Sequence, residues 1–287
     1  MSIVLKNVTY TYMQKTPFER TAIHDINLEI GEGEFIAIIG HTGSGKSTLV
    51  QHLNGLLKPT QGTVTVNGVD LGQKGEAAKI ARKNVGMVFQ YPEQQLFEES
   101  IYADIAFGPR NLDLPEEEVD KRVRRAMQFV NLDYTLYKDR SPFQLSGGQM
   151  RRVAIAGVVA LQPSYLVLDE PAAGLDPCGR DDIFSKLVEL HKKTNTTIIL
   201  VSHNMDDVAK MANRLIVMQE GSICLDGTPK EVFKHTEQLK LSGVDVPQIT
   251  TLLRQLKKSG LNVDENLLTV DQAVKNIIGI VGGRKSC

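Results

Sequence analysis

Cysteine is scarce in this sequence, and the three cysteines present are not spaced as metal ligands or disulfide partners. Cys178, Cys224 and Cys287 are scattered, odd in number and form no Cys-x-x-Cys pair. A zinc site or a disulfide framework needs closely spaced or evenly paired cysteines. We therefore expect neither, and we interpret all three cysteines as structurally incidental.

Long apolar runs are also missing, and neither sign of charge predominates. No apolar stretch approaches the roughly 18 to 20 residues that span a bilayer, and residues 1–6 open a strand pattern, not a signal peptide. Lys plus Arg total 33 against 34 for Asp plus Glu. This balance argues against a broad nucleic-acid footprint or a polybasic membrane anchor. We expect a cytoplasmic protein, and any membrane partner that it has should itself be a protein.

The most informative segment is a glycine-rich loop between an apolar strand pattern at residues 35–39 and a helical pattern near residue 49. Glycines let backbone amides turn around phosphate oxygens, Lys46 adds a mobile positive charge, and the helix directs its positive dipole end at the anion. Ser47 can offer its hydroxyl to Mg²⁺. The predicted phosphate-binding residues are Gly40, His41, Thr42, Gly43, Ser44, Gly45, Lys46, Ser47 and Thr48.

Hydrophobic periodicity divides the chain into strand-rich and helical parts. Up to about residue 40, apolar and polar residues alternate, which predicts antiparallel strands with a turn between two of them at residues 31–34. Helical spacing from about residue 100 to 160 predicts a helical segment inserted between strands. Apolar strands buried on both faces indicate a parallel sheet covered by helices. Further strands are expected at 63–66, 85–89, 165–168 and 197–201, and helices at 182–194 and 205–211.

A second signal is the apolar strand at 165–168, which ends in the adjacent acids Asp169 and Glu170. A buried strand end would direct Asp169 at a magnesium ion opposite Ser47, while Glu170 would orient or deprotonate the attacking water. Two acids can also end a strand at the surface without any function. The phosphate loop upstream favours the catalytic interpretation.

A third motif, Leu-Ser-Gly-Gly-Gln at residues 145–149, precedes a helical pattern that begins at Met150. Exposed amides and a hydroxyl at a helix N-terminus form a second anion site. With the two preceding motifs, this segment resembles the signature motif of ATP-binding cassette (ABC) proteins. The resemblance covers nearly all of residues 1–235 and implies a head-to-tail dimer, in which the signature of one subunit closes over the nucleotide of the other. It implies four residues that act on the other subunit's nucleotide: Ser146, Gly148, Gln149 and Asp176.

The resemblance also implies roles for single residues. Tyr12 matches the aromatic residue that stacks on adenine, with Tyr10 as its competitor. Gln90 matches the glutamine loop that reaches magnesium and the attacking water, and His203 matches the switch histidine that contacts the γ-phosphate. Asp176 would couple the two sites, although Ala-Gly precedes Leu175 where the family more commonly has Ser-Ala or Thr-Ala.

Magnesium-dependent ATP hydrolysis is the activity that these matches imply. The cofactors are then ATP and Mg²⁺, with no covalent enzyme intermediate. The expected catalytic residues are Glu170, His203 and Gln90. The expected magnesium ligands are Ser47, Gln90 and Asp169.

The implied fold class is α/β: an ABC-type P-loop NTPase with a RecA-like core, an antiparallel β subdomain, an inserted α-helical subdomain and a small C-terminal extension. Three leucines of the extension form a short apolar face, which would either contact another subunit or pack on its own cassette; the tail from residue 282 is expected to be frayed. The expected divisions are residues 1–98 and 161–235 for the core, 99–160 for the helical subdomain with the signature, and 236–287 for the extension. The three leucines are Leu252, Leu253 and Leu256.

Finer similarity lies at residues 16–20, 89–97 and 104–111, which look like the A components of energy-coupling factor (ECF) transporters. The Pro-Glu-Gln-Gln-Leu-Phe segment is similar to the second, CbiO-like A subunit. In that family two different A subunits pair, grip a transmembrane scaffold through the region after Gln90, and serve small membrane proteins that capture vitamins or metal ions. The resemblance implies a peripheral motor subunit on the cytoplasmic face of the membrane, with no nucleic-acid partner. The transported substrate cannot be read from this chain, because a separate subunit would hold it.

Three other functions remain as alternatives. A conventional ABC importer ATPase would have the same motifs. A cassette protein acting on DNA or ribosomes would too, but the chain has one cassette, no long heptad insertion and near-neutral charge. A GTPase shares the phosphate loop, yet no Asn-Lys-x-Asp motif for reading guanine is present.

Overall fold

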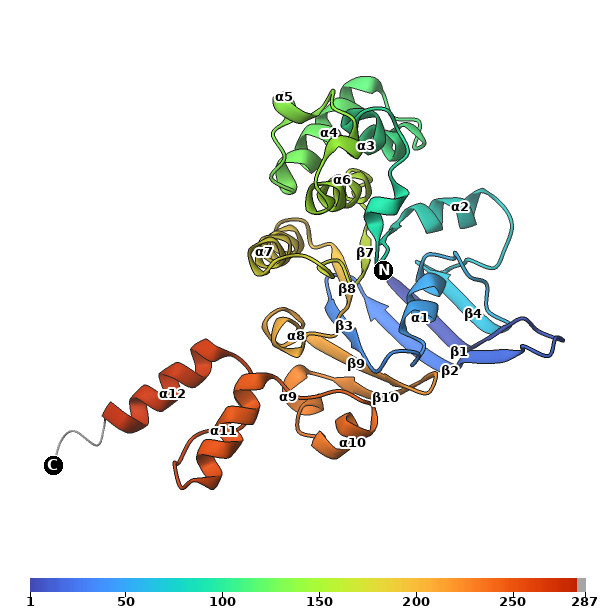
Figure 1. Ribbon diagram of the computed structural model, residues 1–287. Coiled ribbons are helices and arrows are strands. Elements are labelled where there is room, and N and C mark those ends of the chain that lie inside the picture. Colours follow the sequence, from blue (N-terminus) through green and yellow to red (C-terminus); the bar gives the residue numbers. More distant parts are fainter. Residues whose placement is uncertain (283–287) are drawn as a thin grey trace.

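The computed structural model describes residues 1–282, which form two sheets, an inserted group of helices and a C-terminal helical part (Figure 1). In the first sheet the strand order is β2-β1-β4-β5, and all neighbours are antiparallel. Ile3, Leu5 and Val8 of β1 are buried in the core cluster, with a register shift between the last two, so one face of this sheet covers the core. The bounds are β1 (Ser2–Tyr12), β2 (Arg20–Gly31), β4 (Gln61–Val66) and β5 (Val69–Asp70).

The second sheet has six strands in the order β10-β9-β3-β8-β7-β6, parallel except for the β9–β10 pair. Every residue of β3, β7 and β8 is buried, as expected for strands covered on both faces. The α/β fold class is confirmed. The bounds are β3 (Phe35–Ile39), β6 (Val85–Val88), β7 (Tyr165–Asp169), β8 (Thr197–Val201), β9 (Arg214–Gln219) and β10 (Ser222–Gly227).

One strand prediction was wrong in its pairing. The turn at residues 31–34 does not join two antiparallel strands of one sheet; it carries the chain from β2 into β3 of the second sheet, where β3 pairs in parallel with β8 and β9. The reason is that β3 is apolar at all five positions and so requires cover on both faces.

Helices flank the parallel sheet, and a separate helical group is inserted after β6 (Figure 1). Those beside the sheets are α1 (Lys46–Leu53), α2 (Glu76–Lys83), α7 (Pro177–Thr194) and α8 (Met205–Met211). The inserted group comprises η1 (Pro92–Gln95), α3 (Ile101–Arg110), α4 (Glu116–Phe129), α5 (Tyr134–Tyr137), η2 (Pro142–Gln144) and α6 (Gly147–Val159).

Helix α7 begins at Pro177, earlier than the predicted residue 182. Asp176 caps it, because its Oδ1 accepts a hydrogen bond from the Gly179 amide at 2.7 Å. Proline is compatible with the first helical position, since its missing N–H has no partner there. Apolar periodicity alone gave no sign of this polar first turn.

The C-terminal part comprises α9 (Pro229–Val232), α10 (Thr236–Leu241), α11 (Gln248–Lys258) and α12 (Val270–Gly282). Leu239 of α10 shares an apolar cluster with Ala37 and Val217 of the parallel sheet. By contrast, α11 and α12 stand beside the rest of the molecule and enclose a small cluster of their own (Figure 1). The chain after residue 235 therefore packs in two ways: α10 packs on the sheet, whereas α11 and α12 pack on each other, with the Gln248 amide at the start of α11 donating to Asp206 Oδ1 of α8 at 3.0 Å.

The three leucines predicted to share one face of the extension have different environments. Leu253 is fully buried and Leu256 packs against the same cluster, whereas Leu252 is 45 % exposed. Of the three, Leu252 is therefore the one available to a partner. The tail predicted to be frayed lies, apart from Gly282, outside the described residues.

Two further predictions concern cysteine and membrane-spanning helices. Cys178 is exposed and Cys224 is half-buried, and both are free; Cys287 lies outside the described residues. Within residues 1–282 no helix combines the length and the apolar character needed to cross a bilayer.

Candidate nucleotide-binding and catalytic site

The glycine-rich loop between β3 and α1 is shaped by two close backbone approaches. Gly40 has φ 151° and Gly45 has φ 100°, which are conformations that side chains rarely allow. A Cβ on Gly40 would lie 2.3 Å from the carbonyl oxygen of Met218, and a Cβ on Gly45 would lie 2.7 Å from that of Ala22. The loop is therefore pressed between β2 and β9, and its amides follow a path that only glycine permits.

Lys46 begins α1 and is almost buried. Its Nζ donates hydrogen bonds to the carbonyl oxygens of Gly40 at 2.8 Å and His41 at 2.9 Å. Burial lowers the pKa of Lys46, while Glu170 and Asp169 act in the opposite direction. The ammonium group is thus held at the loop and is poorly hydrated, so a bound anion would displace little water from it.

The acidic pair lies at the end of β7. Asp169 is 6 % exposed; burial raises its pKa, and a hydrogen bond from the Ser47 hydroxyl opposes that shift. Glu170 has φ 50°, in the left-handed region, and its amide donates to the carbonyl oxygen of Val201 at 3.1 Å. The backbone therefore turns sharply between a carboxylate that faces Ser47 and one that faces the neighbouring strand ends.

Three predicted catalytic residues meet at the carboxyl ends of three neighbouring strands. Glu170 Oε1 lies 2.6 Å from His203 Nε2, which follows β8. Glu170 Oε2 lies 3.5 Å from Gln90 Nε2, which follows β6. Since β6, β7 and β8 are adjacent in a parallel sheet, their ends converge at the edge where α/β proteins place ligands.

The loop and these residues border one cleft of about 720 Å³, a size typical of small-molecule sites. Tyr12 lies on it, with its hydroxyl 3.2 Å from Thr48 Oγ1. Tyr10 instead packs against the buried ring of His52, with ring centroids 5.0 Å apart. The structure therefore places Tyr12, and not its competitor, at the cleft.

The donors at this cleft fit a nucleotide with magnesium. The Ser44 hydroxyl is fully buried and has no hydrogen-bond partner among residues 1–282, which is a strained arrangement unless a ligand is nearby. Ser47 and Asp169 offer adjacent oxygen atoms, the ligand type that Mg²⁺ prefers. Ordered loop amides, one buried ammonium group and a pair of oxygen ligands together suit a magnesium-bound polyphosphate.

The signature residues do not line this cleft. Ser146 caps α6 and forms a capping box with Gln149, with hydrogen bonds of 3.4 Å and 3.1 Å. Asp176 is exposed at the start of α7. Neither these residues nor Gly148 meets the phosphate loop of the same chain, so a role at a nucleotide requires a second copy of the site.

Two contacts at the site were not anticipated from the sequence. Arg151 is 4 % exposed and hydrogen bonds to the segment that carries Gln90. The carbonyl oxygen of Ser242, in the C-terminal part, accepts a hydrogen bond from the His41 amide at 3.1 Å. In the sequence, the only indication of a role for Arg151 is its position in the apolar helix that follows the signature. Nothing in the sequence indicates the contact of Ser242 with His41, because the two residues are about 200 positions apart.

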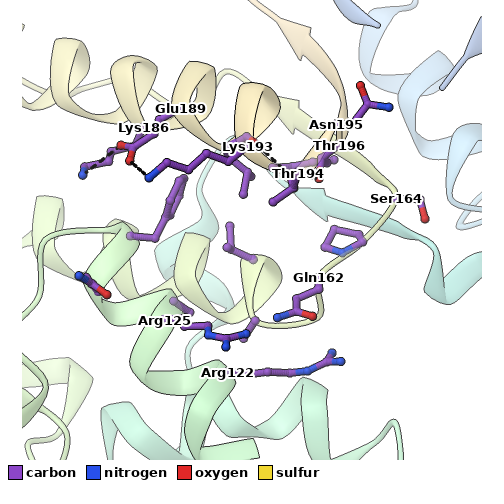
Figure 2. Close-up of a pocket in the computed structure, with 18 of the residues that line it drawn as sticks. Arg122, Arg125, Gln162, Ser164, Lys186, Glu189, Lys193, Thr194, Asn195 and Thr196 are labelled. Carbon is purple, nitrogen blue, oxygen red and sulfur yellow. Dashed lines mark hydrogen bonds and ion pairs between the residues drawn. The ribbon is translucent and has the colours of Figure 1, made fainter. Parts of the chain in front are cut away.

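A second cleft, of about 680 Å³, lies between α4 and the C-terminal end of α7 (Figure 2). It contains none of the motif residues. Lys186 and Lys193 both pair with Glu189, at 3.4 Å and 2.6 Å, and Arg122 pairs with Glu118 at 3.0 Å. The meeting of Glu170 with His203 and Gln90, together with the phosphate loop, therefore favours the first cleft as the candidate catalytic site.

Known proteins match this chain over its whole length. The model of the ABC transporter family matches residues 23–173. The Energy-coupling factor transporter ATP-binding protein EcfA2 of Clostridium tetani is 57 % identical over 99 % of both chains. That of Clostridium perfringens is 56 % identical over 98 % of this chain and 99 % of its own.

Solved structures of ATP-binding cassette proteins have a similar fold. The cbiO1 protein of Clostridium perfringens, described as part of the ABC transporter complex cbiONQ, aligns with a TM-score of 0.73 at 38 % identity, covering 90 % of this chain and 97 % of its own. The ATP-binding cassette MJ0796, solved as a dimer with ADP and Pi, aligns with a TM-score of 0.71 at 29 % identity, covering 79 % and 98 %. With a phosphate loop, a strand-end acidic pair and relatives of this identity along its full length, the chain belongs to the ABC transporter family and, within it, to the energy-coupling factor transporter ATP-binding proteins.

Proposed function

We propose that this chain is the ATP-hydrolysing motor subunit of an energy-coupling factor importer, powering uptake of vitamins or metal ions through separate membrane subunits. The observation that carries the proposal is the carboxylate of Glu170, held between His203 and Gln90 at distances of 2.6 Å and 3.5 Å beside a phosphate loop. A carboxylate in this position can accept a proton from an attacking water molecule.

The residues of the chain divide the work. Loop amides and Lys46 bind the phosphates, and Tyr12 stacks on the base. Ser47 and Asp169 would hold magnesium, with Gln90 as a further ligand, and the ion would supply positive charge beside the phosphates. Glu170 orients and deprotonates the water, while His203 donates a hydrogen bond to the terminal phosphate.

A complete site takes its remaining groups from a second cassette subunit. Ser146, Gly148, Gln149 and Asp176 lie outside the cleft of their own chain, at the N-termini of α6 and α7. There the Ser146 hydroxyl and the first amides of α6 would face a partner's nucleotide. The partner is a different A subunit, so the working unit is a heterodimer.

The surface that follows Gln90 is suited to a membrane-embedded partner. Tyr91, Phe97 and Phe107 are 52 %, 58 % and 45 % exposed, and the two phenylalanine rings pack edge to face at 4.9 Å. Exposed aromatic side chains in one place indicate a protein contact. This aromatic surface binds the transmembrane scaffold, so the chain lies on the cytoplasmic face of the membrane. Nucleic acid is not among its partners.

The catalytic part of the proposal is tested with two variants. Lys46→Ala should weaken nucleotide binding, because a phosphate-binding ammonium group is removed. Glu170→Gln should bind ATP as the parent does but trap a closed dimer, since the amide retains the shape without accepting a proton. Nucleotide titration, size-exclusion chromatography and phosphate release measure these outcomes. Hydrolysis by Glu170→Gln at the parental rate would show that another group activates the water.

The partners are tested by tagging the chain in its native host, solubilising the membranes gently and identifying co-purifying proteins by mass spectrometry. A second cassette ATPase, one integral scaffold and several small membrane proteins are expected. A single dedicated permease would instead indicate a conventional importer. Ribosomes or DNA without any membrane protein would overturn the transport proposal.

A further inference from the structure

Arg151 lies in the second turn of α6, where its side chain is 5 % exposed. A guanidinium group so far from water is stable only when its donors are paired. Its Nε and one terminal nitrogen donate to the two carboxylate oxygens of Glu93 at 3.1 Å and 3.3 Å. The same terminal nitrogen also donates to the carbonyl oxygen of Gln90 at 3.2 Å, and the other donates to the carbonyl oxygen of Ala173.

These three partners lie in two segments around the catalytic centre: Gln90 and Glu93 in the stretch after β6, and Ala173 in the loop after β7. Gln90 is the residue whose side chain approaches Glu170. Glu93 lies in η1, between Tyr91 and Phe97 of the aromatic surface. Ala173 lies between Glu170 and Asp176. One side chain therefore joins the signature helix to the glutamine loop, the partner-facing turn and the loop that follows the catalytic carboxylate.

Arginine is the residue suited to this arrangement. Its planar group carries five donors in a fixed fork, so it can bind a carboxylate with two parallel hydrogen bonds and still reach backbone carbonyls on other segments. The ammonium group of lysine is a single point on a flexible stem and cannot span the same three acceptors. The negative charge of Glu93 offsets the free-energy cost of burying the guanidinium group.

We propose that Arg151 is a positioning residue that couples the partner-facing turn η1 to the hydrolytic site. Its guanidinium holds η1, Gln90 and the Ala173 loop as one unit with α6. When a bound membrane subunit displaces η1, the side chain of Gln90 next to Glu170 and the loop that ends at Asp176 therefore move with it. This inference rests on the proposed function, because it takes the aromatic surface as the membrane contact.

The neighbouring residue provides a matched control. Arg152 also joins α6 to the core, with its Nη2 3.3 Å from a carboxylate oxygen of Asp182 on α7. Its side chain is 27 % exposed, and its partner Asp182 lies on α7, outside Gln90, η1 and the Ala173 loop. Replacing Arg152 therefore removes a bridge between the same parts of the molecule without touching the proposed coupling unit.

The test compares Arg151→Gln and Arg152→Gln in the membrane complex recovered through a tag on this chain. For Arg151→Gln we expect kcat for ATP hydrolysis to fall about tenfold or more with KM for ATP changed less than about threefold, because Lys46 and the phosphate loop are held by contacts that do not involve Arg151. Arg152→Gln should stay within about twofold of the parent in both. Arg151→Lys should be intermediate, since one ammonium group reaches only some of the acceptors.

Coupling between Arg151 and Glu93 is measured with a double-mutant cycle. Glu93→Gln alone should lower kcat, and the double variant should be no worse than Arg151→Gln alone, because the pair acts as one unit. Additive losses would overturn the inference, as would equal effects of Arg151→Gln and Arg152→Gln on kcat or a rise in KM with kcat unchanged. If Arg151→Gln fails to fold, Arg151→Lys and Glu93→Gln complete the cycle and decide between the same outcomes.

The failure of this inference is distinguishable from failure of the proposed function. Glu170→Gln in the same complex reports on the hydrolytic assignment alone. If Glu170→Gln is inactive while Arg151→Gln hydrolyses ATP like the parent, the hydrolytic site stands and the coupling role of Arg151 is refuted. If Glu170→Gln retains activity, the assignment of the site itself is at fault.

Discussion

At the scale of single residues, the site places two groups of opposite charge, Lys46 and Asp169, in buried surroundings. Burial raises the pKa of Asp169 and lowers the pKa of Lys46, so each group is held in surroundings that disfavour its own charge. Each also moderates the shift of the other, since opposite charges favour ionisation. These surroundings make each charge electrostatically costly by itself, and the proposed binding of magnesium at Asp169 and of phosphate at Lys46 would offset that cost.

A first prediction follows for Asp169→Asn in the absence of nucleotide. A carboxyl group whose pKa is raised by folding destabilises the folded state once it is ionised. The penalty is absent below the ordinary pKa of an aspartate, grows as pH rises toward the raised value and is fully present above it. Asp169→Asn should therefore raise Tm at neutral pH by roughly 2–4 °C, which corresponds to about 1 kcal/mol, and the gain should vanish toward pH 4.

Thermal unfolding of the chain without nucleotide at several pH values measures this effect. Asp113→Asn, at an exposed position in a left-handed turn that asparagine tolerates, is the control and should leave Tm unchanged. Asp169→Asn should also lose magnesium-dependent ATP binding. A variant that is less stable than the parent at neutral pH would contradict the sign of the argument.

Residues of the site differ in how far the sequence reveals them. Lys46, Asp169 and Glu170 were predicted because each lies in or beside a short motif at a strand end, where local pattern and spatial position coincide. The buried role of Arg151 and the contact of Ser242 with His41 depend on which distant segments pack together. No local pattern encodes such contacts, so these residues emerge only from the structure.

At the scale of secondary-structure elements, the turn after α10 supports the phosphate loop. The Ser242 carbonyl oxygen accepts the His41 amide, and the His41 carbonyl oxygen in turn accepts Lys46 Nζ at 2.9 Å. Gly243 follows with φ 65°, and a Cβ there would lie 2.9 Å from the Cβ of His41. This turn of the C-terminal part thus fixes one side of the loop.

A second prediction concerns Gly243→Ala. The added methyl group should push His41 away and disturb the carbonyl that holds Lys46, so the Kd for ATP should rise by roughly three- to tenfold, equivalent to about 0.7–1.4 kcal/mol. Nucleotide titration measures it. Gly260→Ala is the matched control, because Gly260 has φ 91° but nothing within 4 Å of the added atom. Gly260→Ala should cost about 1–2 kcal/mol of stability with ATP affinity unchanged; equal affinities for both variants would exclude the support role.

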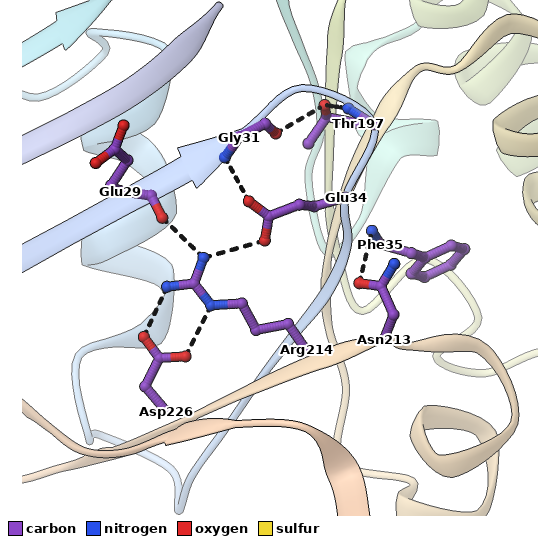
Figure 3. A network of polar contacts seen from close by, with 9 residues as sticks. Glu29, Gly31, Glu34, Phe35, Thr197, Asn213, Arg214 and Asp226 are labelled. Atoms are coloured by element: carbon purple, nitrogen blue, oxygen red, sulfur yellow. Dashed lines mark hydrogen bonds and ion pairs between the residues drawn. The ribbon is translucent and has the colours of Figure 1, made fainter.

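A polar network joins the two sheets at the turn that was assigned to the wrong pairing (Figure 3). Arg214 of β9 binds both carboxylate oxygens of Asp226 on β10, at 2.8 Å and 2.7 Å. It also binds Glu34 at 3.0 Å and the carbonyl oxygen of Glu29 at 2.8 Å. These carboxylates raise the pKa of Arg214 further above its usual range. Such a network explains how the chain can leave β2 and enter a different sheet within a few residues.

A third prediction concerns Arg214→Met. The network is only partly buried, so its loss should lower the free energy of unfolding by about 2 kcal/mol, less than for a fully buried pair. Denaturant unfolding measures this difference. Arg110→Met breaks a pair of similar geometry with Glu116 whose side chains are 46 % and 66 % exposed, and it should cost clearly less stability than Arg214→Met because solvent screens the pair. Equal losses in the two variants would show that burial does not set the value of these pairs.

At the scale of the whole molecule, the C-terminal helices α11 and α12 differ from the cassette in what they leave exposed. One side of α12 contributes Ala273 and Ile277 to the cluster shared with α11. Another side exposes Val270, Val274 and Ile278, at 56 %, 46 % and 65 %. These three residues recur every four positions and so form one apolar stripe. The sequence predicted an apolar face in the extension but placed it on leucines of α11, two of which pack within the extension. Apolar periodicity shows that a helix has an apolar face, but it does not show whether that face packs inside the chain or contacts a partner.

The final prediction is that this stripe of α12 contacts the second cassette subunit. Val274→Glu places a charge in the middle of the stripe and should weaken association with the co-purified cassette ATPase at least about tenfold, because burying an unpaired charge costs more than the apolar contact it replaces. Lys275→Gln, at an exposed neighbouring position, changes the net charge by the same amount and should leave association intact. Analytical ultracentrifugation of the purified pair measures both. Since the stripe lies outside the cleft, ATP affinity should stay at the parental value in Val274→Glu; unchanged association would leave the signature and phosphate-loop faces as the sole basis of pairing.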